Sequence, residues 1–235
     1  MSDSEGTGKM RPTVLGHFAN YRFTARFWEM EGARRRARAR AWFEDVRAAA
    51  DLAHPYLLQG LEAGADVLVW SSVRAEEDEA GARYFMRRAA AESRHRDIVE
   101  PVNTLWGYTR PSEYSKARSA QEVDSFAEER RQYLVVYPFT KTADWYLFGR
   151  ETRQGMMNEH IRIGKQFRRI QQLLLYSFGL QDQEFVVVYE MDDLRLFSRL
   201  VHELRGTEGR RYTASDAPLH TGILTSPEEW LDTLG

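Results

Sequence analysis

Residues 137–164 read YPFTKTADWYLFGRETRQGMMNEHIRIG, a pattern that indicates a strand, an aromatic turn and then a helix. The helix places His160 on an apolar side, because residues three and four apart share one face of a helix. Its neighbours on that face are Met156, Met157, Ile161 and Gly164. A metal-ligating imidazole that faces an apolar interior suits the proximal side of a non-covalently held haem. The alternative is a packed core histidine that is hydrogen-bonded to backbone.

The chain of 235 residues contains no cysteine. This absence excludes disulfides, thiolate metal sites and covalent C-x-x-C-H attachment of haem. Any haem must therefore be exchangeable, and its axial ligand must come from the six histidines or from a weaker donor.

Charge and hydropathy exclude several classes of partner. The formal net charge of −2 gives no bulk attraction to nucleic acid or to a membrane surface. The arginine-rich run 34–40 lies between Trp28 and Trp42 at helical spacing, which favours a solvated helix face over a nucleic-acid arm. No stretch approaches the 18 apolar residues of a membrane span, and the polar N-terminus lacks a signal-like core. We expect a soluble, cytoplasmic protein.

The two halves of the chain show a similar sequence pattern. The segment 58–61 followed by 67–70 is mirrored by 177–180 followed by 186–189. Each half reads as strand, helix, two-stranded hairpin, helix and closing strand. The elements of the first half are expected at 13–23, 25–50, 56–61 with 65–73, 76–92 and 99–109. Those of the second half are expected at 132–140, 151–167, 169–178 with 183–190, 192–205 and 210–224.

This βαββαβ pattern predicts an α+β chain made of two ferredoxin-like repeats. Chance similarity between two hairpins is the alternative interpretation. We divide the chain into a flexible N-terminus, a first repeat, a linker and a second, haem-binding repeat. Their expected limits are 1–12, 13–109, 110–131 and 132–235.

Several motifs occur together and in order along the second half. They are YPF-x-K at 137–141, DWY at 144–146, M-x-x-H-x-x-x-G ending at Gly164, S-x-GL at 177–180 and TE-x-RRY at 207–212. With these motifs the chain resembles the chlorite dismutase-like haem proteins, whose main branches are coproheme decarboxylases and chlorite dismutases. The resemblance implies two fused ferredoxin-like repeats that form a dimeric α+β barrel, with helices outside an antiparallel β-barrel. It also implies a homo-oligomer, a pentamer in the long-chain members.

The resemblance implies roles on the proximal side of a haem. His160 would be the axial ligand of the iron, and Glu208 would accept the second N–H of its ring. An ion pair between Glu208 and Arg205 or Arg211 is the alternative. Met157 and Gly164 complete the histidine motif and would line the cofactor. Glycine in a helix costs about 1 kcal/mol relative to alanine, which close approach of a flat ligand or of a neighbouring strand would justify.

Tyr137 and Lys141 carry the implied chemistry. In the decarboxylases, a tyrosine at the position of Tyr137 is oxidised and takes hydrogen from the β-carbon of a propionate. The alternative is a strand tyrosine packed in the barrel. Lys141 would pair with a propionate carboxylate, while Trp145 and Tyr146 would line the pocket. For the upstream arginine that helps to hold a propionate, Arg130 and Arg131 are both candidates.

The distal side is the second discriminator between the branches. Chlorite dismutases carry an arginine there, and Gln172 occupies the corresponding position when counted from Ser177. A neutral amide can hydrogen-bond peroxide but lacks the cation used with chlorite. The spacing from His160 leaves Gln171 and Arg169 as alternatives.

The resemblance therefore implies hydrogen-peroxide-dependent decarboxylation of coproheme (iron coproporphyrin III) to haem b, with coproheme as both substrate and cofactor. The resemblance also implies ferrochelatase as a transient donor of coproheme. One alternative is chlorite dismutase, which the segment 220–231 favours. Another is a haem-binding or haem-transfer protein with weak peroxidase activity.

Overall fold

The computed structural model describes residues 12–114 and 120–235. The expected flexible N-terminus therefore lies outside the described residues except for its last position. The strands are β1 (Val14–Phe23), β2 (Leu52–Leu57), β3 (Val67–Arg74), β4 (Val99–Tyr108), β5 (Tyr133–Lys141), β6 (Gln171–Tyr176), β7 (Phe185–Met191), β8 (Thr213–Ser215) and β9 (His220–Leu224). The helices are α1 (Ala25–Trp28), α2 (Gly32–Ala48), α3 (Ala80–His95), α4 (Ala143–Leu147), α5 (Arg150–Gly164), α6 (Leu194–Arg205), the 3₁₀-helix η1 (Glu208–Tyr212) and α7 (Pro227–Asp232).

The strands form one closed antiparallel barrel in the order β7-β6-β4-β1-β3-β2-β9-β5, with β5 pairing back to β7. The short β8 pairs with the end of β5 outside this ring. The order β4-β1-β3-β2 in the first half is the same as β9-β5-β7-β6 in the second, because each closing strand lies beside the first strand of its own half. The expected α+β barrel is confirmed, and the matching order supports the proposed duplication.

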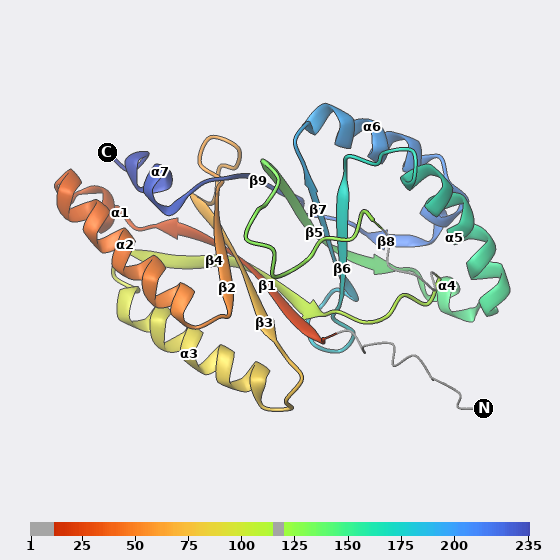
Figure 1. Cartoon of the computed structure of the whole chain (residues 1–235), viewed down its shortest axis with the longest axis horizontal. Coiled ribbons are helices and arrows are strands. Elements are labelled where there is room, and N and C mark those ends of the chain that lie inside the picture. Colours follow the sequence, from red (N-terminus) through yellow and green to blue (C-terminus); the bar gives the residue numbers. More distant parts are fainter. Residues whose placement is uncertain (1–11, 115–119) are drawn as a thin grey trace, which may run out of the picture.

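The helices cover the outside of the barrel in two groups (Figure 1). Helices α1, α2, α3 and α7 lie on the strands of the first half, and α4, α5 and α6 lie on the second. Helix α7 follows the last strand of the second half but packs beside α2, with Trp230 and Leu231 almost fully buried. Packing therefore crosses the boundary between the two expected repeats.

The barrel interior is filled by alternate residues of each strand. Phe18, Trp70, Leu134 and Leu175 belong to this apolar core. Because side chains alternate across a strand, the neighbours of Leu175 point to the outer face of the barrel. Every second residue of β5, β6 and β7 is therefore available to a site between the sheet and the outer helices.

The linker closes a gap in the barrel wall. Strands β4 and β6 pair only at Tyr108 and Tyr176. Where the two strands separate, the N–H of Gln172 donates to the carbonyl oxygen of Gln121 at 2.7 Å, and the N–H of Val123 donates to the carbonyl oxygen of Gln172 at 3.0 Å. Residues 121–123 thus take the place of a neighbouring strand for β6.

Several sequence expectations differ from the structure. The helix expected at 25–50 is two helices, because the Glu31 side chain accepts hydrogen bonds from the N–H groups of Ala33 and Arg34 and starts α2 there. The strand expected at 210–224 is divided into η1, β8 and β9, with a cis peptide bond before Pro218. The strand expected at 56–61 is β2 at Leu52–Leu57, and helices α4 and α7 were not expected.

The proposed correspondence between residues 67–70 and 186–189 is wrong by one residue. Val67 and Val69 pack under the outer helices, whereas Val186 and Val188 pack inside the barrel. The cause is the hairpin connection, because residues 58–66 join β2 to β3 and only residues 177–184 join β6 to β7. A shift of one residue moves every side chain of a strand to the other face.

Candidate functional site

The outer face of the second half carries an apolar row that the helices leave partly uncovered. Tyr137 on β5 pairs with Val187 on β7, which pairs with Leu174 on β6. The Leu174 side chain is 41% exposed, whereas Tyr21 and Val69, on the corresponding face of the first half, are fully buried. One half therefore has a closed core between sheet and helices, and the other has open apolar surface.

His160 lies on α5, one of the helices that cover the second half of the barrel (Figure 1), within range of the charge of Lys141. Its imidazole is partly buried and forms no hydrogen bond with the described residues. Burial lowers the pKa of His160 to about 4, helped by the charge of Lys141 and opposed by that of Glu159. The ring is therefore neutral near pH 7 and keeps a nitrogen lone pair for a metal ion.

Lys141 ends β5 beside Trp145. Its ammonium nitrogen donates to the carbonyl oxygen of Gly209 at 3.1 Å and lies 4.1 Å from the centre of the Trp145 ring. Burial lowers the pKa of Lys141 to about 8, with a further contribution from Arg210 and opposition from Glu184. Within the described residues, no carboxylate forms an ion pair with this ammonium group, which leaves it suited to an anionic ligand.

Tyr137 lies in the same outer face and stacks on Tyr189 of β7, with ring centres 6.3 Å apart. The two hydroxyl groups lie near enough for each to affect the ionisation of the other. Burial, followed by the contact with Tyr189, raises the pKa of Tyr137 well above its usual value. Tyr137 is therefore a neutral phenol at any physiological pH. Tyr189 was not identified from the sequence, because only the β5–β7 register brings the two rings together.

The aromatic turn forms one edge of the site. Trp145 is buried against Tyr212 of η1, with ring centres 6.2 Å apart. Tyr146 is 39% exposed, and its hydroxyl donates to Glu184 at 2.5 Å. The same carboxylate accepts from the backbone N–H of Lys141 at 2.8 Å. Glu184 was missed in the sequence, where an acidic residue in a hairpin loop carries no distinguishing signal.

Glu208 is placed differently from its expected role. Its carboxylate pairs with Arg211 at 3.4 Å, and its backbone N–H donates to the carboxylate of Glu159 at 3.0 Å. This is the ion pair stated as the alternative, so a bond from His160 to Glu208 stays a proposal for the loaded protein.

Met157 and Gly164 lie on α5 with His160, and both are partly buried. A β-carbon added at Gly164 would meet no protein atom within 4 Å. Close approach of a neighbouring strand therefore does not explain this glycine, and only the ligand explanation is left as a proposal.

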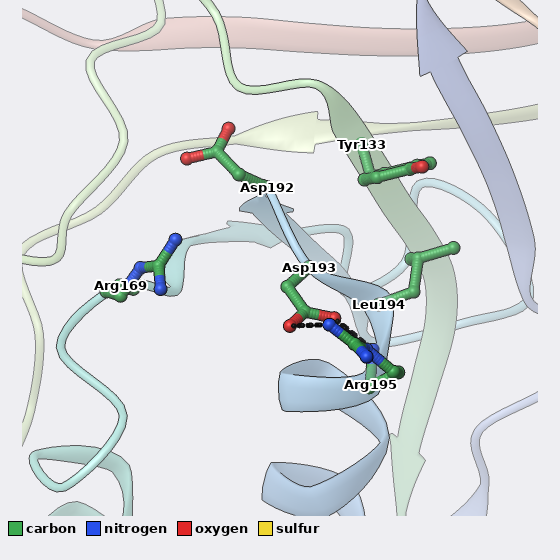
Figure 2. Close-up of a pocket in the computed structure, with 6 residues that line it drawn as sticks. All are labelled: Tyr133, Arg169, Asp192, Asp193, Leu194 and Arg195. Atoms are coloured by element: carbon green, nitrogen blue, oxygen red, sulfur yellow. Dashed lines mark hydrogen bonds and ion pairs between the residues drawn. The ribbon is translucent and has the colours of Figure 1, made fainter.

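Among the distal candidates, Gln172 lies on the outer face of β6, since Leu173 and Leu175 fill the barrel. Gln171 alternates with it and belongs to the opposite face. Arg169 precedes β6 and lines a cavity of about 550 Å³ at the start of α6 (Figure 2). The other lining residues of this cavity are Tyr133, Asp192, Asp193, Leu194 and Arg195.

Neither candidate arginine of the linker faces the outer apolar row. Arg130 is buried in the barrel, 3.5 Å from Glu190 and 4.2 Å from the centre of the Trp70 ring. Arg131 pairs with Asp192 at 2.9 Å. The barrel wall separates Arg130 from Tyr137, so it does not meet a ligand on the outer face.

A family model described as chlorite dismutase matches residues 33–225. The chain belongs to the chlorite dismutase family. This confirms the resemblance seen in the sequence. A coproheme decarboxylase of Mycolicibacterium smegmatis is 30% identical over 181 residues, covering 76% of this chain and 75% of the relative. A coproheme decarboxylase of Staphylococcus carnosus is 30% identical over 145 residues, covering 58% of this chain and 56% of the relative.

Solved structures of this family have the same fold. A mutant chlorite dismutase of Candidatus Nitrospira defluvii matches with a TM-score of 0.82 at 22% identity, covering 94% of this chain and 95% of that one. The chlorite dismutase of the same organism in complex with imidazole matches with a TM-score of 0.79 at 22% identity, covering 94% of each chain. In residues 12–114 and 120–235, no helix combines the length and hydropathy needed to cross a membrane.

Proposed function

We propose that this family member is a coproheme decarboxylase, which uses hydrogen peroxide to convert coproheme to haem b through a three-propionate intermediate. Both curated relatives described above are named coproheme decarboxylase. The observation that carries the proposal is the partly open apolar row on β5–β7, with an oxidisable phenol on its floor and a neutral imidazole on the helix beside it.

The residues of this site fit a porphyrin that carries carboxylates. The exposed Leu174 side chain offers apolar surface to a flat ring. His160 has no hydrogen bond within the described chain, so its ring nitrogen is free for an iron ion. Lys141 has no carboxylate partner there either, so a propionate would supply the missing anion.

Coproheme, when bound, would supply a redox-active iron that peroxide activates. His160 would hold that iron, and its low pKa keeps the ring unprotonated and ready to bind. Lys141 would orient one propionate by charge, with Trp145 holding the ammonium group from the other side. Met157, Gly164 and Tyr146 would line the ring, and Glu208 would reach His160 only after leaving Arg211.

Tyr137 would carry the radical step. Burial, followed by the neighbouring Tyr189, keeps its proton in place until an electron is removed. After losing one electron and one proton, Tyr137 can take a hydrogen atom from the β-carbon of an adjacent propionate, which reforms its O–H. Loss of carbon dioxide and of one further electron then leaves a vinyl group. The two electrons removed from each propionate balance the reduction of one hydrogen peroxide to water. Gln172 would offer peroxide a neutral amide on the distal side.

The remaining parts of this proposal concern the surroundings of the enzyme. We propose a homo-oligomer, a pentamer by family resemblance, that works in the cytoplasm and receives coproheme from ferrochelatase. Addition of ferric coproheme followed by titration with peroxide, with products identified by mass, tests the proposed reaction. Two successive losses of carbon dioxide are expected.

A further inference from the structure

Gln121 is a linker residue outside both expected repeats. It contacts the two elements on either side of the proposed site, helix α5 and strand β6, which are called its two walls below. Its side-chain amide donates to the carbonyl oxygens of Phe167 and Ile170, each at 3.0 Å, and more weakly to that of Gly164 at 3.4 Å. Its own backbone carbonyl accepts the N–H of Gln172 at 2.7 Å. One residue thus bonds to the end of α5 and to the first part of β6.

These bonds matter because α5 carries His160 and β6 carries Gln172. Gly164 is the last residue of α5 and lies one helical turn after His160. The backbone N–H groups of Phe167 and Ile170 donate to the carbonyl oxygens of Gly164 and Phe167, each at 3.0 Å, and form two turns after the helix end. The Gln121 amide bonds to the same two carbonyl oxygens from outside, so it ties these turns to the linker. On β6, the N–H of Val123 donates to the carbonyl oxygen of Gln172 at 3.0 Å. Both backbone groups of Gln172 therefore bond to the linker.

The amide of Gln121 also holds the connection between the walls. Residues 165–170 join α5 to β6, and two of the three bonded carbonyl groups belong to this connection. An amide has two N–H donors, and here three oxygens surround them. The backbone bonds of the connection fix its own turns, whereas the Gln121 side chain bonds these turns to the linker segment that pairs with β6. Loss of its donors would therefore let the turns and the end of α5 shift relative to β6 while the bonds inside α5 and β6 stay intact.

We propose that Gln121 is a positioning residue that sets the separation between the helix carrying His160 and the strand carrying Gln172. This inference rests on the proposed function, which places a flat cofactor between those two side chains. The separation fixes where the iron sits relative to both residues. Displacements of about 1 Å in such a site can lower reactivity on the order of 100-fold.

Three variants test this role. Gln121→Met has a similar length and removes both donors. Gln121→Lys replaces them with three N–H donors that match three carbonyl oxygens. Gln166→Met is the control, because Gln166 is exposed in the same connection and its side chain forms no bond within the described residues. Each variant is compared with wild type by hydrogen exchange of the ligand-free protein, by the Kd for ferric coproheme and by the visible spectrum of the complex.

In Gln121→Met we expect faster exchange of the Gln172 N–H, a Kd for coproheme raised about 10- to 100-fold and a weakened histidine-ligated spectrum. Gln121→Lys should restore all three, and Gln166→Met should match wild type. Wild-type Kd and spectrum in Gln121→Met would overturn the inference and leave the proposed function standing. If Gln121→Met does not fold, a folded Gln121→Lys that still binds weakly overturns it. Failure of the wild-type protein to bind coproheme through histidine overturns both.

Discussion

The ammonium nitrogen of Lys141 lies 4.1 Å from the centre of the Trp145 ring and 3.1 Å from the carbonyl oxygen of Gly209. A ring face and a carbonyl dipole replace only part of the hydration of an ammonium ion. The pKa of Lys141 is accordingly lowered to about 8, chiefly by burial. In the proposed enzyme this unfavourable placement is relieved when a propionate binds.

Lys141→Met should therefore make the ligand-free protein more stable while it weakens binding of coproheme. Because the pKa of Lys141 is lower in the folded state, the unfolded chain holds its proton between about pH 8 and pH 10.5 while the folded chain does not. The contribution of Lys141 to stability thus rises with pH across that window and is unfavourable below it. At pH 7 the ligand-free variant should be more stable than wild type, by on the order of 1 kcal/mol, in urea unfolding. Its affinity for coproheme should fall about tenfold.

The exposed Lys165→Met, at the end of α5, is the matched control and should change neither property. A loss of stability at pH 7 in Lys141→Met would show that the ammonium group stabilises the ligand-free fold.

His160→Ala should abolish the histidine-ligated spectrum of bound coproheme, because His160 is the histidine that the proposal assigns to the iron. Free imidazole should restore ligation by entering the space left by the side chain. His202→Ala, which changes an exposed histidine of α6, is the control. If His160→Ala ligates normally and another histidine variant does not, the axial assignment is wrong.

The imidazole of His160 should stay neutral in mildly acidic solution. Its pKa is lowered from 6.5 to about 4, mainly by burial and then by Lys141, so at pH 6 it is unprotonated while an exposed histidine is largely charged. Nuclear magnetic resonance of the ligand-free protein should show no change at His160 between pH 7 and pH 5. Lys141→Met should raise the pKa of His160 part of the way. A titration midpoint near 6.5 in the wild type would contradict the burial of this ring.

Chlorite should yield little oxygen from the haem b form. Retention and conversion of the released hypochlorite benefit from a distal cation, and Gln172 provides only a neutral amide. Gln172→Arg should raise oxygen release, measured with an oxygen electrode, at least several-fold. Sustained release by the wild type that Arg169→Gln abolishes would show that the distal residue is Arg169 and that the chain acts on chlorite.

The sequence predicted the two βαββαβ patterns because they depend on local periodicity. It did not show the contacts that arise only from closing the barrel. Tyr189 meets Tyr137 through the β5–β7 register, and Glu184 meets Tyr146 through a hairpin loop. The break before α2 depended on capping by Glu31, a weak signal within a strongly helical run.

The candidate site residues were predicted from family motifs, and the structure adds their burial and their contacts. The motif identifies Lys141, but only its burial and its missing carboxylate partner explain why it suits an anion. Gln121 lies in no motif, and its role depends on three carbonyl groups that the folded chain brings together.

The central claim is that Tyr137 carries the radical that decarboxylates coproheme. The direct measurement is a peroxide titration of the coproheme complexes of wild type, Tyr137→Phe and the control Tyr133→Phe, which alters a tyrosine on the same face of β5, with products identified by mass. Wild type and Tyr133→Phe should pass through the three-propionate species to haem b, whereas Tyr137→Phe should bind coproheme normally and form neither product. Full conversion to haem b by Tyr137→Phe would contradict the account.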